Sequence, residues 1–404
     1  MKDVTERFIE YAKIPTMSSE QSTSCPSSEK QRRLAEIIAR ELEALGLEVT
    51  LTQNCYVYAS LEASSGAAAT VGFIAHIDTS PDAPDDNIKP RRVLYSGDDI
   101  LLNEEKGIYL SEKDSPALAL YRGKELIVTD GTTLLGADDK AGVCEIISAL
   151  ETIIEKGLPH GAVKIAFTPD EEIGRGADLF DVEFFGADYA YTVDGGRLGE
   201  IEYENFNAAS AVAEFRGVSI HPGEAKGKMK SAVEMAHEFH SLLPEKEKPF
   251  YTEGYEGFFH LTEMEGVVER ATLRYIIRDH DRDMFSSRKA LFFACADAIN
   301  EKYGKGSVSC TVKDSYYNMR EMIEPHMYIV ERARAAFKAC GVTPVTKPIR
   351  GGTDGARLSF EGLPCPNIST GGENFHSRFE FIPSFAMQKT VEVIVRIISD
   401  LAND

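Results

Sequence analysis

Short apolar runs in the first half of the chain end at a histidine or at carboxylates. Residues 71–75 run into His76, residues 163–167 precede an acidic triplet at 170–172, and residues 189–193 run into Asp194. Apolar runs of about four to eight residues, bounded by polar residues, are typical of buried strands. We therefore predict buried strands whose carboxyl ends carry groups that can bind a metal or move a proton.

A further apolar run, residues 125–128, leads to two adjacent acids, Asp138 and Asp139, at the start of a predicted helix. Taken alone, this pair has an ordinary explanation, because carboxylates at a helix N-terminus interact favourably with the helix dipole. We nevertheless expect the pair to lie at the carboxyl end of a strand, where open α/β sheets bind their ligands. Helical spacing follows as far as Gly157, with apolar residues at Val143, Ile146, Ile147, Leu150, Ile153 and Ile154.

Strands and helices alternate between residues 130 and 194, which predicts an α/β domain with a mixed sheet covered by helices. From residue 208 the order becomes β-α-β-β-α-β, which is that of a ferredoxin-like α+β unit. His376, which the candidate site at the strand ends of the first domain needs, comes only after this unit. We therefore predict a catalytic domain made of residues 1–207 and 318–404, with residues 208–317 inserted as a lid domain.

Composition narrows the choice of partners. The 44 basic and 65 acidic residues give a net charge of −21, which argues against nucleic acid or an anionic membrane as the main partner. No apolar run approaches the roughly 20 residues of a membrane span. The seven cysteines are odd in number and never spaced as C-x-x-C, so neither a disulfide framework nor a thiolate zinc site is expected. A cytoplasmic location fits this pattern.

The candidate site combines imidazole with carboxylate groups. These ligands suit zinc first, with manganese and cobalt as competitors. A metal pair needs a bridging carboxylate, terminal ligands for each ion and a free carboxylate that moves the proton of a water. His76, Asp194 and His376 are candidates, but the chemistry alone does not decide between Asp138 and Asp139, or between Glu171 and Glu172.

Nine segments, spread over nearly the whole chain, resemble the motifs of one family and occur in the same order. They read HIDTSPD from residue 76, TLLGADDKAG from 133, AFTPDEE from 166, YTVDGG from 191, HPGEAKG from 221, YIIRD from 275, DSYYNMRE from 314, PIRGGTDGA from 348 and GLPCPN from 362. The chain is similar to the peptidase T family, the tripeptide aminopeptidases among the two-zinc exopeptidases. It departs from the family at 371–375, where tyrosines are expected to flank the asparagine, and at 95–122, which matches poorly.

The resemblance assigns the ligands that chemistry left open. It implies that Asp138 bridges two zinc ions, that Glu171 is the free general base, and that Asp78 orients the His76 imidazole. It also implies a cis peptide bond between Asp138 and Asp139. The terminal ligands would be His76 and Asp194 for one ion, and Glu172 and His376 for the other.

The resemblance further implies substrate contacts in the second half of the chain. His221 would contact the substrate or transition state, and Arg278 and Arg350 could pair with a peptide carboxylate through a bidentate fork. We expect Arg350 to be the first candidate for reading the C-terminal carboxylate and Arg278 the second. The lid is expected to close and to bring His221 and Arg278 towards the substrate.

The activity implied is a cytoplasmic, zinc-dependent aminopeptidase that releases the N-terminal residue from tripeptides, and assembly as a homodimer is left open. A related two-zinc dipeptidase, carboxypeptidase or N-acyl amino acid deacylase is the nearest alternative, because such enzymes would share the metal ligands. A metal-binding interaction protein that has lost catalysis would be expected to lack a ligand or the base. This chain lacks neither.

Overall fold

The computed structural model describes residues 2–64 and 69–403, and these form two compact units. The first unit contains residues up to Tyr203, Glu321–Lys347 and the chain from Thr353 onwards. The second unit contains Glu204–Arg320 and the short segment Pro348–Gly352. The predicted insertion, 208–317, lies within this second unit.

The segment 348–352 groups with the second unit because its backbone is bonded there. The Ile349 N–H donates to the Glu204 carbonyl at 2.8 Å, and the Arg278 guanidinium donates to the Arg350 carbonyl at 2.8 Å. The sequence prediction placed this segment in the catalytic domain. No periodicity marks so short a stretch of irregular chain.

The first unit is built on a mixed sheet of eight strands in the order β1-β2-β8-β3-β9-β16-β10-β15, which confirms the predicted fold class. Strands β3, β8, β9 and β16 are parallel where they pair, whereas β2 runs antiparallel to β8. The bounds are β1 Glu48–Leu51, β2 Val57–Leu61, β3 Thr70–His76, β8 Ala162–Thr168, β9 Tyr189–Gly195, β10 Glu200–Glu202, β15 Val345–Thr346 and β16 Asn367–Ser369.

The parallel strands explain why distant residues can share one site. In the register, His76 at the end of β3 pairs with Thr168 at the end of β8, and Ile74 pairs with Thr192 of β9. Strand β16 continues this arrangement, since Ser369 pairs with Gly195. The carboxyl ends of all four strands therefore lie at one edge of the sheet.

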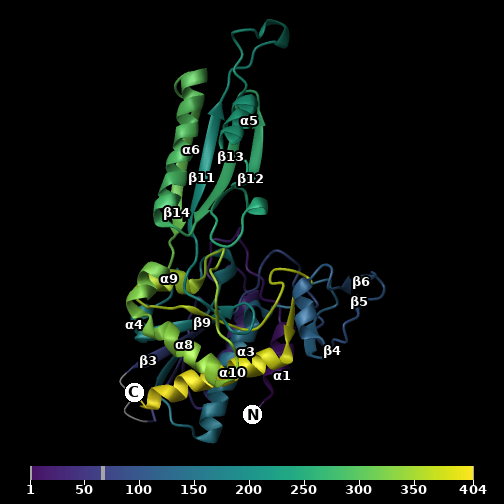
Figure 1. Ribbon diagram of the computed structural model, residues 1–404, viewed down its shortest axis with the longest axis vertical. Helices are drawn as coiled ribbons and strands as arrows, with labels where there is room; N and C mark the ends of the chain where they lie inside the picture. The colour runs from purple at the N-terminus through teal and green to yellow at the C-terminus, as the bar shows by residue number, and fades with distance from the viewer. Residues whose placement is uncertain (1, 65–68, 404) are drawn as a thin grey trace. The chain divides into compact units, whose positions relative to one another are not determined.

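Helix α3, Ala137–Lys156, packs against β3 and β9 and is covered in turn by α1, Val4–Ala12, and α10, Ser384–Asp400 (Figure 1). A separate aromatic cluster covers strands β3 and β8, where Phe185 lies close to Gly72. The other helices of this unit are α2 Lys30–Ala44, α4 Val182–Phe185, α7 Arg320–Ile323, which begins in the second unit, α8 Tyr328–Ala339 and α9 Asp354–Phe360.

Strand β7, Glu125–Val128, corrects one expectation. It does not join the main sheet, because it pairs antiparallel with β4, Arg91–Leu94, on one side and with β17, Phe381–Pro383, on the other. The acids at 138 and 139 therefore do not follow a strand of the parallel sheet. A two-stranded hairpin, β5 Ile100–Asn103 and β6 Ile108–Leu110, completes this region.

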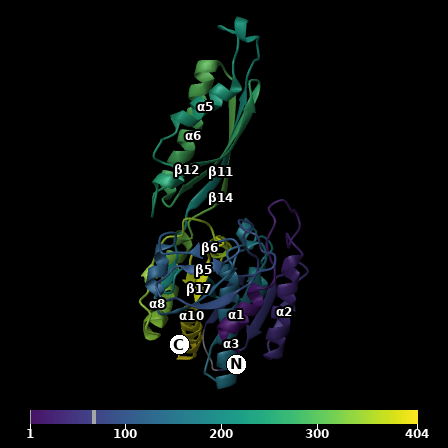
Figure 2. The same ribbon diagram turned by 90° about the vertical axis from the view of Figure 1, so that its right-hand side faces the viewer.

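The second unit has an antiparallel four-stranded sheet in the order β12-β13-β11-β14, with α5 and α6 packed on one face (Figure 2). In chain order it reads β-α-β-β-α-β, as expected for a ferredoxin-like unit. Buried aromatic residues such as Phe239 and Phe292 fill the space between sheet and helices. The bounds are β11 Asn207–Arg216, α5 Ala232–Leu242, β12 Phe258–Val267, β13 Arg270–Asp279, α6 Arg282–Tyr303 and β14 Val308–Tyr316.

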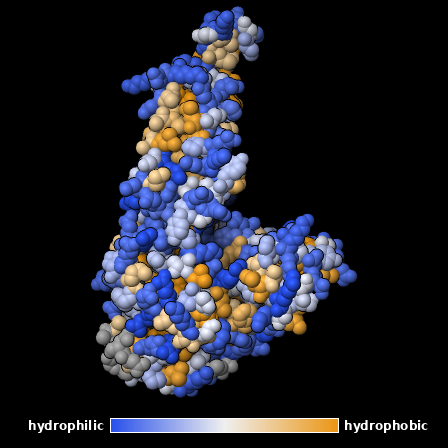
Figure 3. Space-filling view, viewed as in Figure 1, coloured by the Kyte–Doolittle hydropathy of each residue, from blue (hydrophilic) through white to orange (hydrophobic). Residues whose placement is uncertain are grey.

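Hydrophilic residues predominate on the face drawn in Figure 3, in keeping with the charge of −21. Among the described residues, no helix has both the length and the apolar character that crossing a membrane requires. All seven cysteines are free thiols. This agrees with the expectation that the cysteines form no disulfide framework.

Gly142 tests the close packing of α3 against β9. An alanine Cβ there would lie 1.9 Å from the Val193 carbonyl oxygen and 2.4 Å from Asp139 Oδ1. Gly142→Ala should therefore lower the free energy of unfolding by about 3 kcal/mol, the upper end for overpacking. Denaturant unfolding measures this change. Lys156→Ala, exposed in the last turn of the same helix, should change it by less than about 0.5 kcal/mol; equal losses would contradict the argument.

Candidate metal centre

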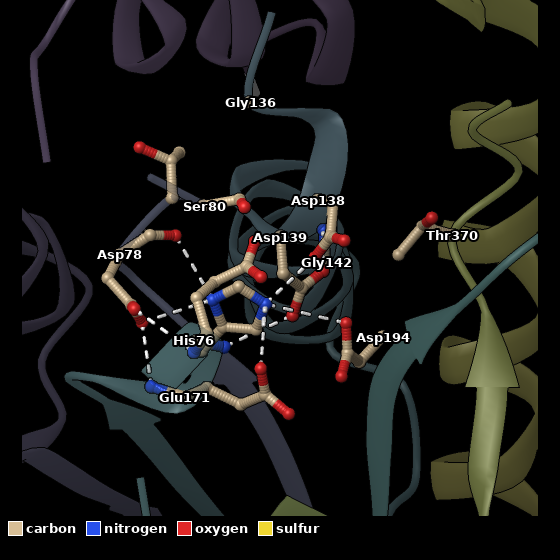
Figure 4. A network of polar contacts seen from close by, with 12 residues as sticks. His76, Asp78, Ser80, Gly136, Asp138, Asp139, Gly142, Glu171, Asp194 and Thr370 are labelled. Atoms are coloured by element: carbon tan, nitrogen blue, oxygen red, sulfur yellow. Dashed lines mark hydrogen bonds and ion pairs between the residues drawn. The ribbon is translucent and has the colours of Figure 1, made fainter. Parts of the chain in front are cut away.

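His76 lies at the centre of a polar network at the carboxyl edge of the main sheet (Figure 4). Its side chain is buried, and its Nε2 atom lies 2.8 Å from Asp138 Oδ1 and 3.5 Å from Asp194 Oδ1. Its other nitrogen, Nδ1, faces Asp78, with the backbone carbonyl at 3.1 Å and the carboxylate at 3.3 Å. The contacts of Nδ1 with Asp78 therefore fix the ring so that Nε2 is directed at Asp138 and Asp194.

Asp138 belongs to two groups of potential ligands. His76, Asp138 and Asp194 form the first group, and Asp138, Glu172 and His376 form the second. Within each group the ligand atoms lie within 4.8 Å of one another. Two cation positions that share the Asp138 carboxylate are the arrangement that a bridged metal pair needs.

His376 enters the second group from the loop between β16 and β17. Its Nε2 atom lies 2.8 Å from Glu172 Oε2 and 3.3 Å from Asp138 Oδ2. Its Nδ1 atom lies 3.0 Å from Asp82 Oδ2 and 3.3 Å from Ser80 Oγ. Both histidines thus have one nitrogen directed at the shared carboxylate and the other held by the segment that follows β3.

The peptide bond between Asp138 and Asp139 is cis, as the family resemblance implies. The two side chains have different surroundings. Asp139 accepts hydrogen bonds from the backbone N–H groups of His76 at 3.1 Å and Gly142 at 3.2 Å, and it belongs to neither ligand group. Only Asp138 faces both imidazoles.

The carboxylates of the site are difficult to keep charged together. Burial raises the pKa of Asp194 to about 6 and that of Glu172 to about 8, and the charge of Asp138 adds to both shifts. Burial also favours the neutral form of Asp138, but hydrogen bonds from His376 and His76 outweigh it and hold the Asp138 pKa below its usual range. The site therefore favours a positive charge beside Asp138.

The residues present fit a pair of divalent cations. Glu172 Oε1 is buried and has no hydrogen-bond partner among the described residues, so this acceptor is left unsatisfied. Imidazole and carboxylate ligands together suit zinc, manganese or cobalt. A divalent ion in each group would neutralise the carboxylates whose pKa values burial raises.

Glu171 stands beside the two groups without belonging to either. Its Oε2 atom lies 4.0 Å from His76 Nε2, and its side chain is only 14 % exposed. Burial raises the Glu171 pKa well above its usual range, and the charges of Asp194 and Asp354 add to the shift. Its backbone is held by Asp78, whose carboxylate accepts the N–H groups of Glu171 at 3.0 Å and Glu172 at 3.2 Å.

Glu380 was missed by the sequence analysis. Its buried carboxylate accepts the backbone N–H groups of Leu135 at 3.0 Å, Gly136 at 2.8 Å and Asp138 at 3.0 Å. It thereby holds the turn that presents Asp138. Sequence patterns do not indicate this role, because the Leu135 donor lies 245 residues away along the chain.

The three predicted substrate contacts all lie in the second unit. His221 is exposed, and its Nδ1 atom accepts the Gly223 N–H at 3.2 Å. The Arg350 guanidinium already donates to the carbonyls of Gly254 at 2.7 Å and Glu256 at 3.2 Å, and to Thr252 Oγ1 at 2.9 Å. Arg278 donates to the Arg350 carbonyl, but its buried Nε has no partner.

Comparison with known proteins gives the family of this chain. The model of peptidase family M20/M25/M40 matches residues 129–400. A protein called peptidase T from Alkaliphilus oremlandii is 55 % identical over 404 residues, covering 98 % of this chain and 99 % of the relative.

Two solved structures have the same fold. An aminopeptidase PepT from Bacillus cereus aligns with a TM-score of 0.79 at 24 % identity, over 99 % of this chain and 98 % of that one. A tripeptidase from Staphylococcus aureus aligns with a TM-score of 0.80 at 22 % identity, over 100 % and 98 %. The chain thus belongs to peptidase family M20/M25/M40 and groups, within that family, with the proteins called peptidase T.

Proposed function

We propose that the protein is a two-metal aminopeptidase that releases the N-terminal residue from tripeptides in the cytoplasm. The observation that carries this proposal is the pair of ligand groups that share Asp138, with the unligated carboxylate of Glu171 beside them. The names of the most similar proteins, peptidase T, aminopeptidase and tripeptidase, support the substrate class.

Zinc is our first choice for the metal, because the ligand set combines two imidazoles with carboxylates. His76 and Asp194 would hold one ion, Glu172 and His376 would hold the other, and Asp138 would be shared between them. When bound, such a pair lowers the pKa of a water molecule and polarises the scissile carbonyl. Asp78 keeps the His76 ring oriented through Nδ1.

Glu171 supplies the proton transfers. Its side chain is largely buried beside the ligand groups, where a positioned carboxylate can accept a proton and return it. Glu171 therefore takes the proton from the attacking water and then gives it to the leaving amine. Asp78 fixes the Glu171 backbone, so the base stays beside the ligand groups.

A tripeptidase must also measure the length of its substrate. The metal pair selects the scissile bond, so a second anchor has to bind the C-terminal carboxylate at a set distance. The contacts of Arg350 favour Arg278 for this role. Both Arg350 Nη atoms donate to protein oxygens, whereas Arg278 donates from Nη1 and its Nε has no hydrogen-bond partner among the described residues. The substrate role of His221 remains part of the proposal.

A dipeptidase, carboxypeptidase or N-acyl amino acid deacylase of the same family would use similar ligands. The decisive assay offers the zinc-loaded protein matched dipeptides, tripeptides, tetrapeptides and an N-acyl amino acid. We expect the highest kcat/KM on tripeptides with a free N-terminus. Preference for the acyl amino acid, or release of the C-terminal residue, would overturn the proposal.

The first prediction concerns metal content. Zinc-loaded protein should contain about two ions per chain, because two ligand groups share one carboxylate. Asp138→Asn should lose most of both, whereas Asp139→Asn should alter folding stability more than metal content, since Asp139 bonds only backbone N–H groups. Elemental analysis after dialysis measures the metal content of the wild-type protein and of both variants. One ion per chain with full activity would contradict the two-metal mechanism.

The second prediction separates two adjacent glutamates. Glu171→Gln should keep both ions and lose about a hundredfold or more in kcat, because general acid–base catalysis contributes about 10²–10⁴-fold. Glu172→Gln should instead weaken the binding of one ion. Metal titration and steady-state kinetics on the same preparations test this pair. If the two variants exchange behaviour, the assignment is off by one position.

The third prediction concerns length selection. Amidation of the tripeptide C-terminus should cost roughly 1.5–3 kcal/mol in transition-state binding, or about ten- to a hundredfold in kcat/KM. Arg278→Ala should show the same loss on the free acid and little further loss on the amide, since the charged partner is already absent. Arg350→Ala serves as the matched comparison. Equal amide penalties in wild type and in Arg278→Ala would show that another residue binds the carboxylate.

A further inference from the structure

The carboxylate of Glu373 joins three segments of the first unit. It accepts two hydrogen bonds from Arg197, from Nε at 2.6 Å and from Nη2 at 3.2 Å, and one from the Tyr121 hydroxyl at 2.6 Å. Its side chain is only 11 % exposed. A bidentate arginine pair with a further phenol donor is a strong and directional arrangement.

Glu373 begins the loop that carries His376. Its N–H and carbonyl exchange hydrogen bonds with Phe381 at 2.9 and 3.1 Å, which closes the loop at its base. Between these points Asn374 and His376 both have φ values of 60°, a region that residues other than glycine seldom adopt. The loop therefore depends on contacts from outside to keep this conformation.

Arg197 connects this loop to the other ligand group. It lies in the turn that follows Asp194 at the end of β9. The same turn accepts the N–H groups of Thr370 and Gly371 through the carbonyls of Gly195 at 3.0 Å and Gly196 at 2.8 Å. The Arg197–Glu373 pair thus ties the turn after Asp194 to the loop of His376.

Tyr121 and Ser115 connect the segment 95–122 to the loop that carries His376. The Tyr121 ring is buried and packs edge-on against Phe381, with ring centroids 5.7 Å apart. Asn374 donates from Nδ2 to Ser115 Oγ at 2.9 Å and to the Phe379 carbonyl at 3.1 Å. This segment therefore supports the His376 loop from a second side.

We infer that Glu373 is a positioning residue that fixes His376 relative to Asp138 and Asp194, and that segment 95–122 contributes through Tyr121 and Ser115. The inference rests on the proposed metal site. Residues that orient a ligand through its surroundings typically change metal affinity by about 10–100-fold when they are replaced. Among the described residues, Glu373 belongs to neither ligand group, and its carboxylate bonds Arg197 and Tyr121 and not the candidate base.

The experiment titrates metal-free, full-length protein with Zn²⁺ by calorimetry. His376→Ala first identifies which of the two binding events belongs to the second ligand group. Glu373→Gln should weaken that same event by about 10–100-fold and leave the other unchanged, because the amide cannot accept all three donors. In the His376→Ala background, Glu373→Gln should cause no further loss.

Glu238 offers a control of similar chemistry outside these segments. Its carboxylate accepts hydrogen bonds from Lys302 Nζ at 2.7 and 2.8 Å and from the Tyr303 hydroxyl at 2.7 Å, and it lies in α5 of the second unit. Glu238→Gln should leave both binding events unchanged. Tyr121→Phe removes one hydrogen bond to Glu373 and should produce a smaller loss in the same event.

Two results would overturn the inference. The first is unchanged binding of both ions by Glu373→Gln, with or without a fall in melting temperature, which would reduce Glu373 to a structural role. The second is an equal loss in Glu238→Gln. If wild-type protein binds fewer than two ions, or if His376→Ala retains both events, the proposed metal site itself fails, and the outcome is distinguishable from failure at Glu373 alone.

Discussion

The candidate site depends on several carboxylates being buried at one edge of a sheet. Asp138, Glu172 and Asp194 converge there, and burial favours the neutral form of each. Two imidazoles moderate the repulsion in the structure by bonding to Asp138. Much of the surrounding structure holds these acids close together, in positions where bound cations would neutralise them.

Two further carboxylates support the candidate ligands and the candidate base. Asp78 bonds the backbone of Glu171 and Glu172, and Glu380 bonds the turn before Asp138. Such carboxylates accept N–H groups and so remain satisfied without a metal. The protein therefore uses acids both as candidate ligands and as clamps on the backbone, and the identity of the hydrogen-bond donor separates the two uses.

Much of this arrangement could be predicted from the sequence. The apolar runs before His76 and Asp194 identified parallel strands, because a buried strand needs apolar side chains on both faces. The β-α-β-β-α-β order identified the second unit. Strand β7 was misplaced because a short apolar run does not reveal which sheet it joins. The choice of Asp138 over Asp139 required the family resemblance, since neighbouring acids differ only in the contacts they make.

Other contacts were beyond any sequence pattern. The backbone donors to Glu380 and the arginine partner of Glu373 are distant in the chain, and only folding brings them together. Arg350 was the first candidate for binding the C-terminal carboxylate, but its guanidinium already donates to the carbonyls of residues 254 and 256. The sequence identifies which side chains can bind a carboxylate, whereas the structure shows which of their hydrogen-bond donors already have partners within the protein.

Strand β16 gives the sheet an unusual dependence on the order of synthesis. It inserts between β9 and β10, although it is formed by residues 367–369, near the end of the chain. While the polypeptide is still growing on the ribosome, β9 has an open edge, and the histidine after β16 has not yet been made. An unpaired edge is a site for wrong pairing. In any stage in which β9 has formed before β16, the candidate ligand groups are therefore incomplete and the central sheet has an open edge.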